Sequence, residues 1–107
     1  MTNEIYKALS DPTRRHILEL LRAQDMTAGE LASHFNLAKP TLSRHFSVLK
    51  QADLIHADKN GTTITYHLNV SVLEDALLLL MSTFQLPRKS PSSQVKSNNT
   101  KGASYEA

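Results

Sequence analysis

Hydrophobic positions in the first quarter of the chain repeat at helical spacing. Ser10-Asp11-Pro12 has the composition of a helix start, because Asp11 can accept free backbone N–H groups and Pro12 suits the first helical position. The apolar positions that follow lie on one side of a helix, at Ile17, Leu18, Leu20 and Leu21. We expect an amphipathic helix here, with a short helix before it around residues 5–9.

A closely spaced pair of helices is predicted next. Thr27-Ala28-Gly29-Glu30 has the spacing of a capping box, flanked by Met26 and Leu31 as a hydrophobic staple, so a helix should run from there to about Phe35. A second helix should run from Lys39 to about residue 51. Its inner face carries apolar side chains at helical spacing, at Leu42, Phe46 and Leu49.

Alternating residues after position 53 predict a β-hairpin. Ile64, Tyr66 and Leu68 alternate with polar neighbours, which is the period of a strand with one buried face. We expect strands over residues 54–58 and 62–68, joined at Lys59-Asn60-Gly61, because Asn-Gly favours the positive φ values of a tight hairpin turn.

The last predicted helix is apolar on almost every side. Ser71-Val72-Leu73-Glu74 has the spacing of a second capping box, and the helix it opens should continue to about Leu86. A helix that is apolar all round must be covered from more than one side, and so small a domain offers only one. We expect a second copy of the chain to supply the missing cover. The composition of residues 87–107 predicts a disordered basic tail.

Together these elements predict one domain over residues 1–86, mainly α with a small β-hairpin. The two closely spaced helices form a helix-turn-helix, and the hairpin after them supplies a wing. The expected fold class is therefore a winged helix-turn-helix.

The net charge of +2 over 107 residues belongs to the tail rather than to the domain. Residues 1–86 carry eight Lys and Arg against nine Asp and Glu, whereas residues 87–107 carry four against one. The absence of Cys excludes disulfides, thiolate metal sites and a Cys nucleophile. No signal peptide is evident, and the longest apolar run, residues 76–81, is too short to span a membrane. We expect a cytoplasmic protein.

The positions of the charges are more informative than their sum. No Asp or Glu occurs between Leu31 and Ala52, and a surface that faces DNA phosphates selects against carboxylates. The candidate DNA contacts on the second helix of the pair are Lys39, Thr41, Ser43, Arg44 and Ser47. Arg44 could bind guanine bidentately and Lys39 a phosphate. The competing interpretation is an ordinary solvated helix face.

The hairpin tip adds Lys59 and Asn60, which could reach the DNA backbone or a minor groove. The competing interpretation for the tip is ordinary turn chemistry. The five histidines include no i, i+4 pair of a helical zinc motif, and His45, near the core edge, is expected to pack or to form a hydrogen bond. No nucleophile elbow or Gly-rich phosphate loop occurs. We expect no cofactor, no metal and no enzymatic activity.

Three segments of the chain resemble the ArsR family of bacterial winged-helix repressors. They are Leu9–Leu18, Leu31–Phe35 and Lys39–Leu49, and the hairpin end Thr65–Leu68 is similar too. The resemblance covers about residues 4–86. Within the family, the chain is most similar to the Sdp-type autorepressors.

The resemblance implies a homodimer that represses transcription by binding inverted-repeat operators in double-stranded DNA. Its DNA contacts carry over to Lys39, Thr41, Ser43 and Arg44, and further to His45 and the wing. The first and last helices should pack across the two-fold axis. The candidate interface residues on them are Ile5, Tyr6, Leu9, Leu73, Leu77, Leu80, Met81 and Phe84.

The chain departs from the family pattern at the positions where metal-sensing members bind their metal. Metal-sensing members carry cysteines in the helix that here contains Leu31 and Ala32, or paired Asp and His in the last helix, where this chain has only Glu74 and Asp75. Metal sensing is therefore not expected, and sequestration by a regulatory protein becomes a candidate for release from DNA. Asp53 replaces a glycine common before the wing, which Asp tolerates because it can adopt a left-handed conformation. The alternative to a repressor is a winged-helix protein-interaction module without DNA binding.

Overall fold

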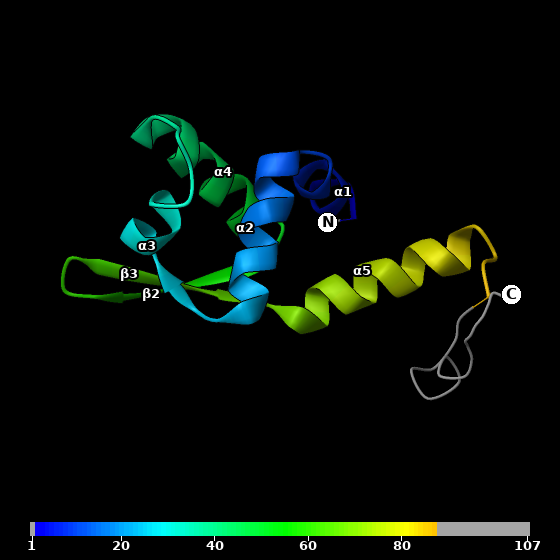
Figure 1. Ribbon diagram of the computed structural model, residues 1–107. Coiled ribbons are helices and arrows are strands. Elements are labelled where there is room, and N and C mark those ends of the chain that lie inside the picture. The colour runs from blue at the N-terminus through cyan, green and yellow to red at the C-terminus, as the bar shows by residue number, and fades with distance from the viewer. Residues whose placement is uncertain (1, 88–107) are drawn as a thin grey trace, which may run out of the picture. The chain divides into compact units, whose positions relative to one another are not determined.

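The computed structural model describes residues 2–87 of the chain. Its elements are α1 (Thr2–Leu9), α2 (Pro12–Ala23), β1 (Met26–Thr27), α3 (Ala28–Ala32), α4 (Lys39–Gln51), β2 (Ile55–Asn60), β3 (Thr63–Leu68) and α5 (Val70–Thr83) (Figure 1). The chain divides within α5 into two compact units, Met1–Ala76 and Leu77–Ala107. Of the tail predicted over residues 87–107, residues 88–107 lie outside the described residues.

Two predicted helix starts are confirmed. Asp11 caps α2, because its side chain accepts the backbone N–H of Arg14 at 3.1 Å, and Pro12 is the first helical residue. At α3, Thr27 Oγ1 accepts the N–H of Glu30 at 3.1 Å, and Glu30 Oε1 accepts the N–H of Thr27 at 2.9 Å. The capping box therefore satisfies two N–H groups that a helix start leaves free.

The end of α3 was predicted incorrectly, because the helix ends at Ala32 rather than near Phe35. The N–H groups of His34 and Phe35 donate to carbonyls three residues back, at 3.0 and 3.1 Å. This is 3₁₀ spacing, which tightens the chain into the turn before Lys39. The predicted span of α4 is confirmed.

Within residues 2–87 the sheet has three strands, one more than predicted, in the order β1-β3-β2. β2 and β3 pair antiparallel from Ile55 with Leu68 to Asn60 with Thr63, so the hairpin loop is residues 61–62. The prediction of a turn at residues 59–61 is therefore wrong. Positive φ is needed at the first loop position, and Gly61 supplies it with φ 67°.

The strand missed by the prediction is β1, which pairs with the other edge of β3. Met26 lies opposite Tyr66, and Thr27 lies opposite Thr65. Two residues are too few to show a strand period in the sequence. Their pairing joins the segment before α3 to the wing.

A Schellman motif ends α4 at Asp53, which has φ 60°. The N–H of Asp53 donates to the carbonyl of Lys50 at 2.9 Å, and that of Leu54 donates to the carbonyl of Leu49 at 3.0 Å. The left-handed conformation expected of Asp53 is confirmed. Asn69 holds the same corner, because its Nδ2 donates to the Asp53 carbonyl at 3.0 Å and its N–H to the Leu54 carbonyl at 2.9 Å.

The start predicted for α5 is wrong by two residues, because the helix begins at Val70 rather than after a cap at Ser71. The N–H of Leu73 donates to the carbonyl of Asn69 at 3.3 Å. Asn69 therefore occupies the cap position, and Ser71 lies inside the first turn. The tertiary hydrogen bonds of Asn69 decide between these two residues, both of which are good caps.

The C-terminal end of α5 is a second Schellman motif. Gln85 has φ 55°, its N–H donates to the carbonyl of Ser82 at 3.1 Å, and the N–H of Leu86 donates to the carbonyl of Met81 at 2.8 Å. This motif ends α5 at Thr83, before the predicted end at Leu86.

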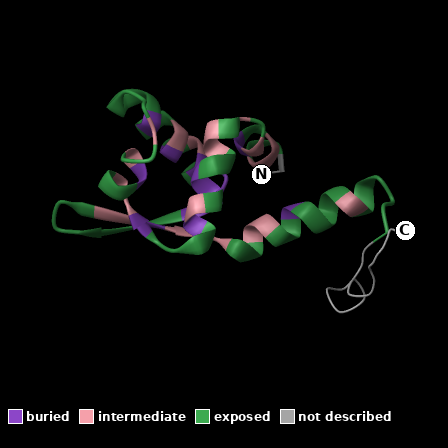
Figure 2. Cartoon of the chain, in the orientation of Figure 1, coloured by how far each residue is buried: buried purple, intermediate pink, exposed green. Residues whose placement is uncertain are grey.

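The hydrophobic core of the first unit lies between its helices and the inner face of the sheet (Figure 2). The predicted inner face of α4 is confirmed, since Leu42, Phe46 and Leu49 are all buried. The ring of Phe46 lies 4.7 Å from that of Tyr66 on β3, so α4 is packed directly on the wing strand. None of the helices described between residues 2 and 87 is long and apolar enough to cross a membrane.

Candidate nucleic-acid interface

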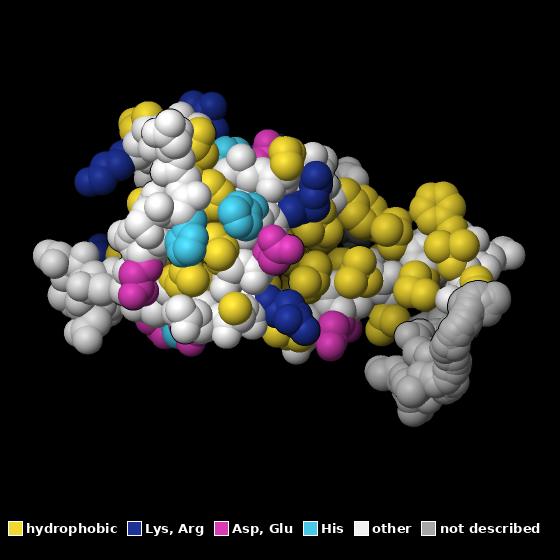
Figure 3. All heavy atoms as spheres, in the orientation of Figure 1, with side chains coloured by type: hydrophobic (Ala, Val, Ile, Leu, Met, Phe, Trp, Pro, Cys, Tyr) yellow, Lys and Arg dark blue, Asp and Glu magenta, His cyan; other side chains and the backbone are white. Residues whose placement is uncertain are grey.

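The outward face of α4 is exposed and polar. Its exposed candidates are Lys39, Thr41, Ser43, Arg44 and Ser47. Within residues 2–87, no hydrogen bond or ion pair engages these five side chains. Lys and Arg side chains project at the outer end of α4 in Figure 3, and the helix itself carries no Asp or Glu. These donors are therefore available to an external anion.

The wing presents its two candidates at the end of β2. Lys59 pairs with Ile64 and Asn60 with Thr63 through the backbone, and both candidate side chains are exposed. They are strand residues beside the Gly61-Thr62 loop, so the ladder fixes the direction in which they project.

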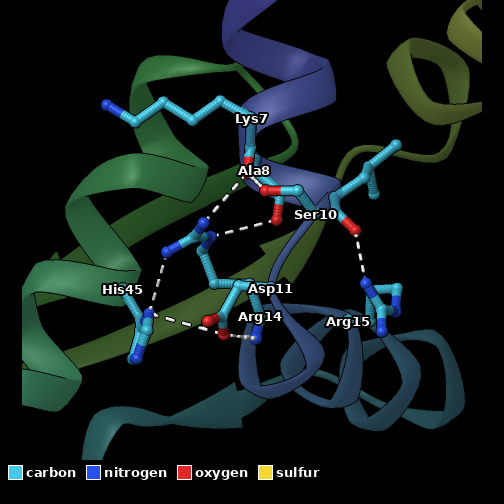
Figure 4. Close-up of polar contacts among 8 residues, drawn as sticks. Lys7, Ala8, Ser10, Asp11, Arg14, Arg15 and His45 are labelled. Carbon is cyan, nitrogen blue, oxygen red and sulfur yellow. Dashed lines mark hydrogen bonds and ion pairs between the residues drawn. The ribbon is translucent and has the colours of Figure 1, made fainter.

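His45 differs from the other seven candidates, because it is engaged within the molecule (Figure 4). Arg14 Nη1 donates to His45 Nδ1 at 3.1 Å, and Asp11 Oδ2 lies 3.9 Å from the same nitrogen. The His45 side chain is only 14% exposed. Since Arg can only donate, Nδ1 accepts and the ring proton lies on Nε2, which points away from Arg14 and Asp11. The hydrogen-bonding role predicted for His45 is confirmed.

Arg14 and Arg15 bind the C-terminal end of α1. Arg14 Nε donates to the carbonyl of Ala8 at 3.0 Å and Nη2 to that of Lys7 at 2.9 Å, while Arg15 Nη1 donates to the carbonyl of Leu9 at 2.7 Å. The last carbonyls of a helix lack intrahelical partners and carry its partial negative charge. Sequence periodicity placed both arginines on a polar helix face and indicated neither contact.

The carboxylate of Asp11 completes this corner. Partial burial acts to raise its pKa, but the backbone N–H of Arg14 and the Arg14 guanidinium together hold the pKa below its usual value. Asp11 therefore stays charged, both as the cap of α2 and as a counterion for Arg14.

A second cluster missed by sequence reasoning joins the wing to the segment before β1. His67 Nδ1 lies 2.7 Å from Asp25 Oδ2, and His67 Nε2 lies 2.7 Å from Asp58 Oδ2. The hydrogen bond with Asp25, supported by that with Asp58, outweighs partial desolvation and raises the pKa of His67. Both ring nitrogens can donate at once only in the imidazolium form. We call these three residues the wing clip.

The wing clip is not arranged as a metal site, because the two carboxylates lie on opposite nitrogens of one ring. In the part of the chain that the structure describes, no group of three or more His, Asp or Glu residues could hold a metal ion. His16 instead packs edge-on against Phe35, with ring centroids 5.1 Å apart.

The candidate interface residues lie on α1 and α5. Those that are half-buried are Ile5, Tyr6, Leu9, Leu73 and Met81. On α5, Leu77, Leu80 and Phe84 are 48%, 36% and 66% exposed. Hydrophobic side chains gather along α5 in Figure 3. Such a contiguous apolar surface is typical of a protein interface.

The first unit also carries an apolar groove of about 210 Å³. It is lined by Leu9, Leu18, Leu68 and Leu73, together with Arg15, Glu19 and Arg22. Two of the candidate interface residues, Leu9 and Leu73, therefore line one groove.

Comparisons with known proteins agree with this architecture. Residues 11–57 match the family described as bacterial regulatory protein, arsR family. The transcriptional repressor SdpR of Bacillus subtilis (strain 168) is 52% identical over 75 residues, which cover 70% of this chain and 83% of the relative. The arsenical resistance operon repressor of Staphylococcus xylosus is 41% identical over 70 residues, covering 65% of this chain and 67% of the relative.

A solved structure extends the agreement to three dimensions. The crystal structure of an ArsR family transcriptional regulator superimposes with a TM-score of 0.72 at 30% identity, covering 78% of this chain and 91% of that one. The matched family segment spans the cap of α2, the helix-turn-helix and the first half of β2. This protein therefore belongs to the ArsR family of bacterial regulatory proteins, and it is a DNA-binding transcriptional repressor with a winged helix-turn-helix, not an enzyme.

Proposed function

We propose that the protein represses its own operon in the cytoplasm, as a homodimer that binds an inverted-repeat operator. In this proposal α4 enters the major groove, with Arg44 and the hydroxyls of Thr41, Ser43 and Ser47 at base edges or phosphates. Lys39 binds a phosphate, and Lys59 and Asn60 of the wing reach the adjacent backbone or minor groove.

The outward face of α4 is the observation that carries the proposal. Its hydroxyls, Lys39 and Arg44 are exposed and have no partner within residues 2–87, and the acid-free stretch from Leu31 to Ala52 surrounds them. A protein partner has no general need of a surface without carboxylates, whereas a phosphate backbone does. A protein-interaction module without DNA binding is therefore not favoured.

The exposed apolar face of α5 supports the homodimer. Leu77, Leu80 and Phe84 recur at helical spacing and are all exposed in the single chain. A two-fold dimer would bury this face against itself or α1 and set the two α4 helices about one turn of DNA apart.

Because no metal-ligand cluster occurs in residues 2–87, we propose that a protein partner, rather than a metal, releases the repressor.

Selection from a pool of random DNA duplexes tests the proposal with the full-length protein. We expect enrichment of a pseudo-palindrome whose half-site centres lie about 10–10.5 base pairs apart or a multiple of this. The Lys39→Ala, Arg44→Ala double variant should lose the enrichment. The Lys7→Ala, Arg22→Ala double variant removes two positive charges elsewhere and should retain it. Failure of the unmodified protein to enrich any sequence at low salt would contradict DNA recognition.

A further inference from the structure

We propose that Arg14 is a positioning residue for DNA recognition, which holds α4 at a fixed angle to α1 without touching DNA itself. The inference rests on the proposed function, because it assigns α1 to the dimer interface and α4 to the major groove. It adds a residue that couples these two surfaces within one chain.

The contacts of the Arg14 guanidinium carry the proposal (Figure 4). All three of its nitrogens are used, with Nε and Nη2 on the carbonyls of Ala8 and Lys7 in α1 and Nη1 on His45 Nδ1 in α4. Because the guanidinium is rigid and planar, bonds from three nitrogens determine the relative placement of their acceptors. Lys could not reproduce this geometry with one ammonium group.

The Arg14–His45 bond also determines how His45 is held. Arg14 has no acceptor, so it selects the ring form in which Nδ1 is unprotonated. The Asp11 carboxylate lies 3.9 Å from the same nitrogen and attracts the Arg14 guanidinium electrostatically. His45 directly follows Arg44, so a fixed His45 side chain restrains rotation of α4 and the direction in which Arg44 projects.

This restraint matters because two copies of α4 must fit two half-sites at once. The spacing of the α4 helices in the dimer depends on how each is oriented relative to the interface helix of its own chain. A bidentate arginine contact tolerates only small errors of placement. Loosening α4 from α1 should therefore lower affinity for the correct spacing and lower discrimination against incorrect spacings.

The test measures affinity for the palindrome that the unmodified protein selects, and for versions with one base pair inserted or removed at its centre. Arg14→Ala should weaken binding to the selected duplex about tenfold, which corresponds to loss of one charge-assisted hydrogen bond. It should also reduce the preference for the correct spacing. Arg15→Ala is the matched control, because it removes the same charge and one α1 cap but no contact with α4, and it should change binding less than about twofold.

His45→Leu is a second test, because it removes the contact between Arg14 and α4 but keeps the Arg14 hydrogen bonds to the carbonyls of α1. It should reproduce the loss and the weaker spacing preference, and the Arg14→Ala, His45→Leu double variant should lose no more than either single variant. ¹⁵N NMR of the imidazole should show the Nε2–H form in the unmodified protein and a tautomer mixture in Arg14→Ala.

Distinct outcomes separate the two proposals. Equal losses in Arg14→Ala and Arg15→Ala, additive losses in the double variant, or an unchanged spacing preference would each overturn the positioning role while leaving DNA recognition intact. If the unmodified protein selects no palindrome, the proposed function itself fails.

Discussion

Arg44 and Arg14 show how the same residue type acquires two different roles from its surroundings. Arg44 is exposed and has no hydrogen-bond partner within residues 2–87, so its five donors remain available. Arg14 uses Nε, Nη1 and Nη2 on acceptors inside the molecule. Composition counts both as basic residues, but of the two only Arg44 keeps all its donors available to an external acceptor.

Replacement of Arg44 by Ala should cost about 1–3 kcal/mol of operator binding and relax specificity at one base pair of each half-site. Lys39→Ala should instead weaken binding to all sequences alike and lower the salt slope by about one, because a phosphate contact carries no base information. Fluorescence anisotropy with singly substituted duplexes at several salt concentrations measures both effects. If Arg44→Ala kept full discrimination at every position, Arg44 would be excluded from base contact.

At the scale of single elements, the start and the end of the helix-turn-helix are fixed by different kinds of hydrogen bond. The start of α3 is set locally by Thr27 and Glu30, three residues apart. The end of α4 is set by Asp53 in a left-handed conformation and by Asn69, which comes from the far end of the hairpin. Local hydrogen bonds of the first kind are visible in a sequence, whereas the second kind requires the folded hairpin.

Asp53→Val should therefore destabilise the domain by about 1–3 kcal/mol, because a β-branched residue at φ 60° is strained. Asp53→Asn should cost less than about 1 kcal/mol, since Asn tolerates this conformation. Urea unfolding followed by circular dichroism gives the free energy of unfolding. Equal stabilities for the Val and Asn variants would show that Asp53 is not under backbone constraint.

The wing clip predicts a pH dependence with a definite sign. The pKa of His67 is raised in the folded state, so the clip contributes its full stabilisation below the unfolded value of 6.5 and loses it as pH rises through the raised pKa. We expect the difference in unfolding free energy between the unmodified protein and His67→Gln to be larger at pH 5.5 than at pH 9. High salt should reduce it, because the groups are exposed.

Two comparisons control this measurement. Asp58→Asn removes one of the two carboxylates and should shrink the pH-dependent difference. His56→Gln changes the cross-strand neighbour of His67 but neither carboxylate. Replacing His67 in this background should therefore still cost more unfolding free energy at pH 5.5 than at pH 9. A difference that stays constant from pH 5.5 to 9 would mean that protonation of His67 does not stabilise the wing.

At the scale of the whole molecule, α5 carries most of the large hydrophobic side chains that are exposed among the described residues. Ala76 is its only buried residue among those described, and the four leucines that follow it are 36–49% exposed. Exposing these leucines to water is unfavourable by about 25 cal/mol per Å² of apolar surface. We therefore expect this face of α5 to be buried by association with a second copy of the chain.

Leu77→Asp should shift the protein from dimer to monomer, because a carboxylate in an apolar interface lacks a partner. Operator affinity should fall with it, since a monomer contacts one half-site only. Sedimentation equilibrium measures the first effect and anisotropy the second. Ser82→Asp adds the same charge to α5 outside the predicted interface residues and should remain dimeric. A Leu77→Asp protein that is still a dimer would place the interface elsewhere.

Features that depend on near neighbours in the chain could be predicted from the sequence. Helical spacing predicted α2 and α4, the Thr27 capping box predicted the start of α3, and alternation predicted β3. The exposed candidate donors on α4 followed from the same spacing, because a helix with one apolar face must expose the other.

Features that join distant segments depend on how the folded chain packs. β1 exists because Met26 pairs with Tyr66, and α5 begins after Asn69 because that residue is bound to the end of α4. Arg14 reaches His45, and His67 lies between two carboxylates, only once separate elements have packed. Local hydrogen bonds and hydrophobic periodicity depend on residues that are close in the sequence. The partner of a long polar side chain depends instead on which segments the folded core brings together.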